Sequence, residues 1–315
     1  MAEKLFDGSV LKSALLGAEL SLEAHIEELN LLNVFPVPDG DTGVNMFSTM
    51  QAANKAATNI TSNSAADVSR VIARGALLGA SGNSGVILSQ ILRGIAKGLE
   101  LKESFSCVHF AQSLRAAAEM ACRAVNNPVE GTIITVSREA ADVAVRMAEE
   151  GASLEQTLEA VAAQARETVD KTPEMLPQLK EAGVVDAGGK GLQYIFEGMR
   201  NCVSKRIARP VEQEEVSVSP RAELISHGYG YDFQFLIRGH NLPVAKVRSR
   251  IEKMGESAII VGDDGIIRVH IHTHQPDAIM EYARSVGEVT DIVRESLDEQ
   301  VRDFRSRHGR VPDSV

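Results

Sequence analysis

The sequence predicts an all-α domain followed by a smaller α+β domain, and three observations lead to this prediction. Apolar residues recur at helical spacing between residues 10 and 203, so helices alone account for the first two hundred residues. A charged stretch with two prolines and no periodicity follows, which is typical of a linker. Beyond it, β-rich runs appear for the first time. We expect domains at 1–204 and 222–315, joined by a linker at 205–221.

Helices in the first domain are predicted wherever apolar residues recur three and four positions apart, because that spacing places them on one face of a helix. The first such pattern runs from Val10 to about Leu32, with polar residues between the apolar ones. Further helices are expected near residues 43–58, 65–80, 84–99, 107–126, 131–150, 153–171 and 188–203, separated mostly by Gly, Asn or Pro.

The second domain mixes two kinds of pattern. Residues 231–237 alternate, and residues 257–261 and 266–273 are β-rich, so each of these runs predicts a strand. Helical patterns fit 243–254 and 276–286. We expect the chain to end in a charged helix that continues into a polar tail.

Composition and charge narrow the class of function. The chain has 315 residues, of which 44% are apolar and 24% are charged, as in a packed globular protein. Its formal net charge of -10 repels a nucleic-acid backbone, and no basic patch compensates for it. The three cysteines form no CxxC pair, which indicates a reducing cytosol. We find neither a secretory leader nor an apolar run of membrane-spanning length, and therefore expect a cytoplasmic protein without a membrane span.

The most informative segment is NVFPVPDGDTGVNM at residues 33–46, between two predicted helices. Its two prolines fix their own φ and favour extended geometry in the residues before them, which stiffens the approach to Asp39. In an extended segment Asp39 and Asp41 project to one side, and Gly40 lets a ligand approach the backbone. Two carboxylates on a stiff loop suit Mg²⁺, whose coordination shell is completed by phosphate and water oxygens.

Two other structures fit parts of this loop. The bare DGD motif also fits a turn that starts a helix, with Thr42 as its cap, but the paired prolines favour the metal site. An EF-hand is excluded, because the glycine that it needs at its sixth position would fall at Val44. The amide oxygens of Asn33 and Asn45 are further candidate ligands.

A second candidate region, GALLGASGNSGVIL at residues 75–88, is rich in glycine and leads into a predicted helix. Ser84 is a candidate cap for that helix. Free backbone N–H groups and the positive end of the helix dipole favour phosphate at such a terminus, and Asn83 and Ser84 offer further donors. The segment lacks the GK[ST] of a Walker A loop, and a close crossing of two helices explains its glycines equally well.

Two further clusters of small and hydroxyl residues stand at predicted helix starts, PVEGTIIT at 128–135 and GVVDAGGKG at 183–191. Backbone donors are unpaired at such positions. Asp186 with Gly188 and Gly189 is a candidate contact for the base or ribose of a nucleotide, although ordinary helix junctions have the same composition.

Taken in order, the motifs NVFPVPDGDTGVNM, GALLGASGNSGVILSQILRG, NPVEGTIITV and EAGVVDAGGKGL resemble the nucleotide-binding domain of dihydroxyacetone kinases, the DhaL or DAK2 family. They are most similar to the form of this domain at the start of bacterial fatty acid kinase. HGYGYDFQFLI and IIRVHIHTHQPDAIMEYARSVGEVTDI resemble the middle domain of that kinase, so the resemblance covers nearly the whole chain. Four ordered motifs are far more specific than one glycine-rich loop.

The resemblance implies a barrel of antiparallel amphipathic helices, with ATP at one open end and two Mg²⁺ ions held by acidic residues. Asp39 and Asp41 would bind the metal and serve catalysis, with Asn33 as a further ligand. The nucleotide contacts that the resemblance implies are Thr42, Gly43, Asn45, Met46, Gly79, Gly82, Asn83, Ser84, Gly85, Thr132, Asp186, Gly188 and Gly189.

The sequence departs from the family pattern in two places. Ser81 stands where relatives have arginine in GARGNSG, which removes a cation from the neighbourhood of the phosphates. The full-length kinase also has a C-terminal domain that engages its lipid-binding partner, and no residues for it follow Val315. We therefore expect either a fragment or a missing part that is a separate chain.

Histidines alternate along one predicted strand, at His270, His272 and His274. Residues two apart on a strand share a face, so these imidazoles are expected on one side, where they could bind zinc. In relatives a cysteine in the GYGY segment joins two histidines that match His270 and His272, and here Asp232 takes its place. An aspartate can also bind Zn²⁺. The alternative is a polar strand face in a dimer interface.

The expected function is ATP-dependent phosphoryl transfer to a small acceptor. The resemblance favours a fatty acid carboxylate presented by a separate DegV-like fatty-acid-binding protein, which would give an acyl phosphate. Such a carboxylate is ionised at neutral pH and needs no general base. Two alternatives stay open: a nucleotide subunit of the dihydroxyacetone kinase type, and a non-catalytic nucleotide-binding regulatory protein. We expect ATP and Mg²⁺ as cofactors, Zn²⁺ as a candidate in the second domain, and a homodimer formed through that domain.

Overall fold

The computed structural model describes residues 4–204 and 228–308, and the expected linker at 205–221 lies outside these residues. The first described range is helical, as predicted. Its helices are α1 (Gly8–Glu23), α2 (Ile26–Leu31), α3 (Thr42–Thr58), α4 (Ala65–Gly79), α5 (Gly82–Gly98), α6 (Cys107–Ala124), α7 (Ile133–Glu149), α8 (Leu154–Met175), α9 (Pro177–Ala182) and α10 (Ala187–Val203).

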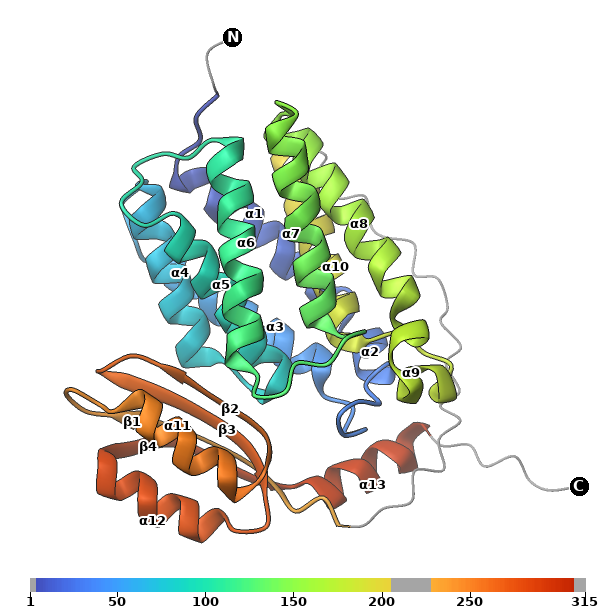
Figure 1. Cartoon of the computed structure of the whole chain (residues 1–315), viewed down its shortest axis with the longest axis vertical. Coiled ribbons are helices and arrows are strands. Elements are labelled where there is room, and N and C mark those ends of the chain that lie inside the picture. Colours follow the sequence, from blue (N-terminus) through green and yellow to red (C-terminus); the bar gives the residue numbers. More distant parts are fainter. Residues whose placement is uncertain (1–3, 205–227, 309–315) are drawn as a thin grey trace, which may run out of the picture.

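The long helices form a barrel around an aliphatic core (Figure 1). The first helix, α1, packs along the last, α10, and closes the ring. The two approach so closely that a Cβ added at Gly17 or Gly198 would collide with the backbone of the other. Because aromatic residues make up only 4% of the chain, aliphatic side chains such as Leu22, Leu88 and Leu158 fill the interior.

The helix boundaries differ from the predicted ones where a break is too short to disturb the apolar pattern. The expected single helix over residues 10–32 is α1 and α2, which are separated at Ala24 and His25. The short helix α9, which begins at Pro177, was not predicted. A helix of one or two turns contains too few residues for a 3.6-residue repeat to be recognised.

The second domain is an antiparallel sheet with the order β2-β3-β1-β4. Helices α11 and α12 cover one face of the sheet, and the other face is turned toward the barrel (Figure 1). Together with the barrel, this domain confirms the predicted fold class. Its elements are β1 (Tyr231–Arg238), α11 (Val244–Ile251), the 3-10 helix η1 (Glu252–Met254), β2 (Glu256–Gly262), β3 (Ile266–Thr273), α12 (Pro276–Val286), β4 (Glu288–Ser296) and α13 (Leu297–His308).

The sequence did not reveal strand β4. Most of its residues are exposed, and a register shift interrupts its pairing with β1, so no clean alternation of apolar and polar residues marks it. The charged helix expected at the end of the chain is α13. It leaves the sheet and runs beneath the end of the barrel (Figure 1).

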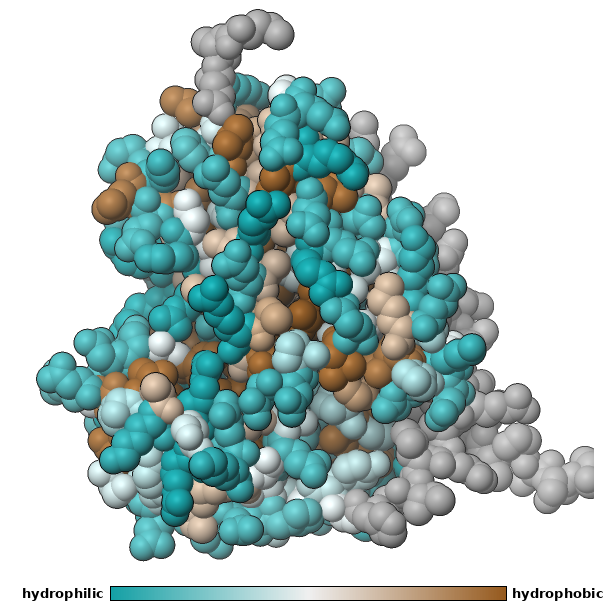
Figure 2. All heavy atoms as spheres, in the orientation of Figure 1, coloured by the Kyte–Doolittle hydropathy of each residue, from teal (hydrophilic) through white to brown (hydrophobic). Residues whose placement is uncertain are grey.

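The sheet is attached to the barrel by a small apolar interface. Leu77 and Val86 of the barrel share a buried cluster with Leu236 and Val261 of the sheet. Beside it, Nη1 of Arg93 donates a hydrogen bond to the Gly262 carbonyl, with an N···O distance of 2.9 Å. Figure 2 shows apolar residues gathered where the two domains meet. The contact fixes the polar part of the sheet face over the end of the barrel.

Candidate functional site

A cavity of about 520 Å³ lies between the end of the barrel and the inner face of the sheet. Its volume falls within the range of ligand sites, roughly 300–1,000 Å³. One wall comes from the loop before α3 and the starts of α5, α7 and α10, and the other from β1, β2 and β3. The four motifs of the first domain, which the resemblance assigned to one nucleotide site, therefore meet the histidine strand of the second domain, which was predicted as a separate site.

The loop between α2 and α3 presents Asp39 and Asp41 to this cavity. Asn33 fixes the loop from inside: its Nδ2 donates to Oδ1 of Asp39 at 2.7 Å and to the Val37 carbonyl at 2.8 Å. The Thr42 hydroxyl donates to Oδ1 of Asn33. In this structure Asn33 thus orients an acidic side chain, and its own amide oxygen accepts from Thr42.

The two carboxyl groups lie within hydrogen-bonding reach of each other and strongly influence each other's protonation. Burial raises the pKa of Asp39 well above its usual value, and the nearby carboxylates of Asp41 and Asp232 raise it further. Burial raises the pKa of Asp41 to about 6, although a hydrogen bond to Asn45 lowers it. A divalent cation between the two would favour their ionised forms. Carboxylate oxygens on one loop are the kind of ligand that Mg²⁺ prefers.

The glycine-rich segment spans the end of α4 and the start of α5. The helix begins at Gly82, with Ser81 at the N-cap and without a side-chain hydrogen bond from it, so Ser84 lies inside the first turn and is not the cap. Asn83 and Ser84 line the cavity. The Gly82 N–H donates to Oε1 of Gln234 in the sheet at 3.1 Å. This helix start faces the cavity, as anion binding at a helix terminus requires.

The starts of α7 and α10 form another part of the barrel wall. Thr132 caps α7, and Oδ2 of Asp186 caps α10 by accepting from the Gly189 N–H at 2.7 Å. Both line the cavity with Gly188 and the apolar Ile133. Burial raises the pKa of Asp186 to about 6. An apolar surface beside a carboxyl group is suited to a base with hydrogen-bonding edges.

Several candidate nucleotide contacts do not line the cavity and instead support its walls. Asn45 is buried and its side chain bonds to Asp41, and Met46 is fully buried in the barrel core. The remaining ones are glycines at close approaches, where a Cβ would crowd a neighbouring helix or side chain: Gly43, Gly79, Gly85 and Gly189.

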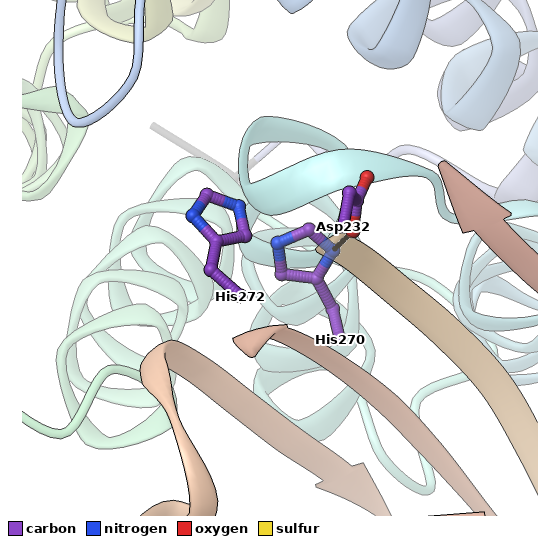
Figure 3. A group of neighbouring side chains, drawn as sticks. All are labelled: Asp232, His270 and His272. Carbon is purple, nitrogen blue, oxygen red and sulfur yellow. Dashed lines mark ion pairs between the residues drawn. The ribbon is translucent and has the colours of Figure 1, made fainter. Parts of the chain in front are cut away.

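On the sheet wall, Asp232, His270 and His272 bring their ligand atoms within 4.8 Å of one another. Figure 3 shows the three side chains projecting from two neighbouring strands toward the barrel. The β1–β3 register places Asp232 opposite His272. His274, expected on the same face, follows the end of β3 and is exposed, so it does not join the group.

Burial keeps the imidazoles of this group neutral. It lowers the pKa of His270 to about 3, aided by Arg268, and that of His272 to about 4, aided by His270. Oδ1 of Asp232 lies 3.2 Å from Nδ1 of His270, but these atoms are not aligned for a hydrogen bond. Both ring nitrogens of His270 therefore lack a hydrogen-bond partner, which is unusual for buried polar atoms. Neutral imidazoles and a carboxylate are the donor set of a zinc site.

Gln234 was missed by the sequence analysis. It lies two residues after Asp232 on β1 and joins both walls, because its Oε1 accepts from Gly82 and its Nε2 donates to Oδ2 of Asp232 at 2.6 Å. The period of two along a strand was the signal that could have identified it. Glu252 and Glu256 also line the cavity and were not expected. None of the described lining residues is Lys or Arg, so a bound polyphosphate would require cations from solution.

Comparison with known proteins identifies both domains. The DAK2 domain family matches residues 36–201, and the family of FakA-like middle domains of fatty acid kinase matches residues 228–304. None of the helices in the described part of the chain has the length and apolar run that a bilayer crossing requires.

Two curated relatives match almost the entire chain. The uncharacterized protein SSP1546 of Staphylococcus saprophyticus is 35% identical over 94% of this chain and 56% of its own length. Protein YloV of Bacillus subtilis is 33% identical over 100% of this chain and 60% of its own length, so the chain spans little more than half of these relatives. The crystal structure of the dihydroxyacetone kinase of C. freundii aligns with 62% of this chain and 35% of that chain, at 17% identity and a TM-score of 0.49, which is too distant to establish a shared activity. The two family matches show that this chain belongs to the DAK2-domain family and that its second domain is a FakA-like middle domain of the fatty acid kinase type.

Proposed function

We propose that the chain binds Mg·ATP in the cavity between its domains and transfers the terminal phosphoryl group to a fatty acid carboxylate presented by a separate binding protein. The observation that carries this proposal is the placement of Asp39 and Asp41, side by side in a cavity that also contains the start of α5. Membership of a family that includes kinase domains supports it. The partner would be a DegV-like fatty-acid-binding protein.

Different parts of the cavity wall would bind the phosphates, the base with its ribose, and the metal ion. Asn83, Ser84 and the backbone donors at the start of α5 would bind phosphates, aided by the positive end of a helix of 17 residues. Ile133, Gly188 and Asp186 would receive the base and ribose at the starts of α7 and α10. Asp39 and Asp41 would hold Mg²⁺ beside the terminal phosphates.

The transfer itself requires positioning and charge neutralisation more than covalent help from the protein. A carboxylate oxygen of the acceptor attacks the terminal phosphorus, the bond from that phosphorus to the bridging oxygen breaks, and ADP leaves with the electron pair. The acceptor is already ionised at neutral pH, so no protein group needs to remove a proton. Bound Mg²⁺ would neutralise charge on the transferring group, which is important here because no Lys or Arg lines the described cavity wall.

Zinc fits the group formed by Asp232, His270 and His272. The unpartnered nitrogens of His270 and the neutral state of both imidazoles support this assignment. Three protein ligands would leave one position for a group in the cavity, as in catalytic zinc sites. Zinc there would add positive charge to the sheet wall, opposite Asp39 and Asp41.

The test is to incubate the chain with ATP, Mg²⁺ and an oleate-loaded fatty-acid-binding protein, and to measure acyl phosphate and ADP. We expect Asp39→Ala to abolish both products while circular dichroism stays unchanged. The matched control is Asp142→Ala. Asp142 is exposed on α7, and its ion pair with Arg115 is long, at 3.8 Å, and also exposed. Its activity should equal that of the wild type.

The outcomes separate the alternatives. Turnover with dihydroxyacetone and a sugar-binding subunit, but not with the fatty acid, would show that the chain is a kinase with a different acceptor. Tight Mg·ATP binding without turnover of either acceptor would favour a non-catalytic regulatory protein, for which the absence of cationic side chains among the described lining residues is the supporting observation. Unchanged turnover by Asp39→Ala would remove the metal assignment.

A further inference from the structure

We propose that helix α13 of the second domain positions the Asp39–Asp41 loop of the first domain for metal binding, with Phe304 as the positioning residue. This inference rests on the proposed function, because α13 can position a metal ligand only if the Asp39–Asp41 loop holds the Mg²⁺ of Mg·ATP. Phe304 would touch neither metal nor nucleotide. It would act by holding the backbone between the two acidic residues.

One face of α13 lies along the loop. Leu297 and Val301, one turn apart, pack with Val37 in an apolar cluster that is separate from the cores of both domains. Leu297 is fully buried and Val301 nearly so. A turn further on, the ring of Phe304 lies against Gly40, so that a Cβ added at Gly40 would collide with it. The spacing of these three α13 residues, i, i+4 and i+7, places them on one side of the helix.

The start of α13 is fixed to the sheet that forms the other wall of the cavity. The Leu297 N–H donates to the Gly230 carbonyl at 3.0 Å, and Oδ1 of Asp298 accepts from the Tyr229 N–H at 2.9 Å. Both acceptor and donor immediately precede β1, the strand that carries Asp232. The helix thus extends from the sheet wall to the acidic loop (Figure 1).

The loop requires support on this side because of its own chemistry. Asn33 holds Asp39 from the barrel side, at 2.7 Å. Gly40 has φ +72, a conformation that glycine both adopts and leaves easily. A rotation of the backbone at Gly40 would carry the two carboxyl groups apart, although one metal ion needs both of them. The Phe304 ring against Gly40 restrains the backbone between Asp39 and Asp41. A metal site requires that its ligand residues are held in place by such neighbouring groups.

The test compares nucleotide binding by calorimetry with and without Mg²⁺, in the full chain. We expect Phe304→Ala to weaken binding of Mg·ATP by about tenfold, the lower end of what loss of a residue that orients a metal ligand costs. Binding of ATP in EDTA should be unchanged, because the phosphate and base contacts do not involve α13. The weakened binding should recover as the Mg²⁺ concentration is raised. A purely structural role would not produce this dependence on Mg²⁺.

Two further variants complete the design. Arg302→Ala, on the exposed side of the same helix, is the matched control and should bind Mg·ATP like the wild type. Phe304→Leu keeps apolar volume without the flat ring, should lose less affinity than Phe304→Ala, and carries the comparison if the alanine variant does not fold. Equal Mg·ATP affinity in the wild type and both Phe304 variants overturns this inference alone. A wild type that does not bind Mg·ATP overturns the proposed function and this inference with it.

Discussion

The two walls of the cavity are built in opposite ways. On the barrel wall, Asp39 and Asp41 come from one loop and are held by nearby side chains such as Asn33. On the sheet wall, Asp232 and His272 lie forty positions apart in the chain and meet only because β1 pairs with β3 in one register. A shift of that register by one residue would turn one partner to the opposite face. The acidic pair of the first wall is therefore a property of one motif, and the ligand group of the second wall is a property of strand pairing.

The ionisable groups of the two walls also differ in the direction in which burial shifts their pKa values. The carboxyl groups of the barrel wall have raised pKa values, as Asp41 at about 6 illustrates, and the imidazoles of the sheet wall have lowered ones, as His270 at about 3 illustrates. Burial disfavours the charged form in both cases. Each wall would be stabilised by a cation, but the oxygen donors suit Mg²⁺ and the imidazoles suit Zn²⁺. This difference can be tested one wall at a time.

The largest effect is expected from Asp41→Asn on the barrel wall. The amide keeps the shape of the side chain but loses its charge, so Mg²⁺-dependent ATP turnover should fall by roughly 100-fold to 1,000-fold. The nucleotide-free protein should become more stable, because burial of the Asp41 charge no longer costs free energy. Turnover assays and thermal unfolding check the two parts. A loss of stability together with a loss of turnover would mean that the substitution damaged the fold instead of the metal site.

The second prediction concerns pH and Asp186. Its pKa in the folded chain is about 6, above the ordinary value of 3.8, so the folded state holds this proton more tightly than the unfolded state does. The resulting stabilisation is complete below pH 4 and is lost as the pH rises through 6. Relative to Asp186→Asn, the wild type should lose about 2 kcal/mol of unfolding free energy between pH 4 and pH 7. Urea unfolding of both nucleotide-free proteins over this range gives the difference. A pH-independent difference would contradict the assignment.

On the sheet wall, His270→Ala should weaken zinc binding by at least about tenfold. The reason is that it removes one of three buried ligands that share a single site. His274→Ala is the matched control, since that histidine is exposed and lies beyond the end of β3. Competition with a chromogenic chelator measures both affinities. Equal zinc affinity in the wild type and the two variants would remove the zinc site and leave the sheet wall as a polar surface.

The smallest effect is expected at the link between the walls. Gln234→Ala removes the hydrogen bonds to Gly82 and Asp232, and the adjoining cavity lets water replace them in part. The unfolding free energy should therefore fall by only about 1 kcal/mol. Chemical denaturation of the nucleotide-free protein measures it. A much larger loss would show that the two walls depend on each other for folding.

Much of the fold could be predicted from the sequence because long helices and buried strands leave a periodic pattern. The barrel helices, β1, β3 and the two-domain division follow from that pattern. The break at His25, the short helix α9 and the exposed strand β4 leave none, since each is too short or too polar to repeat. The Asp39–Asp41 pair was also predictable, because its donors and the prolines that stiffen them are neighbours in the chain.

The sequence by itself determined which segments are helical and which residues are candidate metal ligands, since both depend on neighbours within a few positions. Only the tertiary structure decided that the acidic loop and the histidine strand face each other across one cavity, and that Gln234 and Phe304 of the second domain contact Gly82 and Gly40 of the first. The physical reason is that packing two domains together brings side chains from distant parts of the chain into contact. No local spacing records which face of a sheet will be turned toward the end of a barrel.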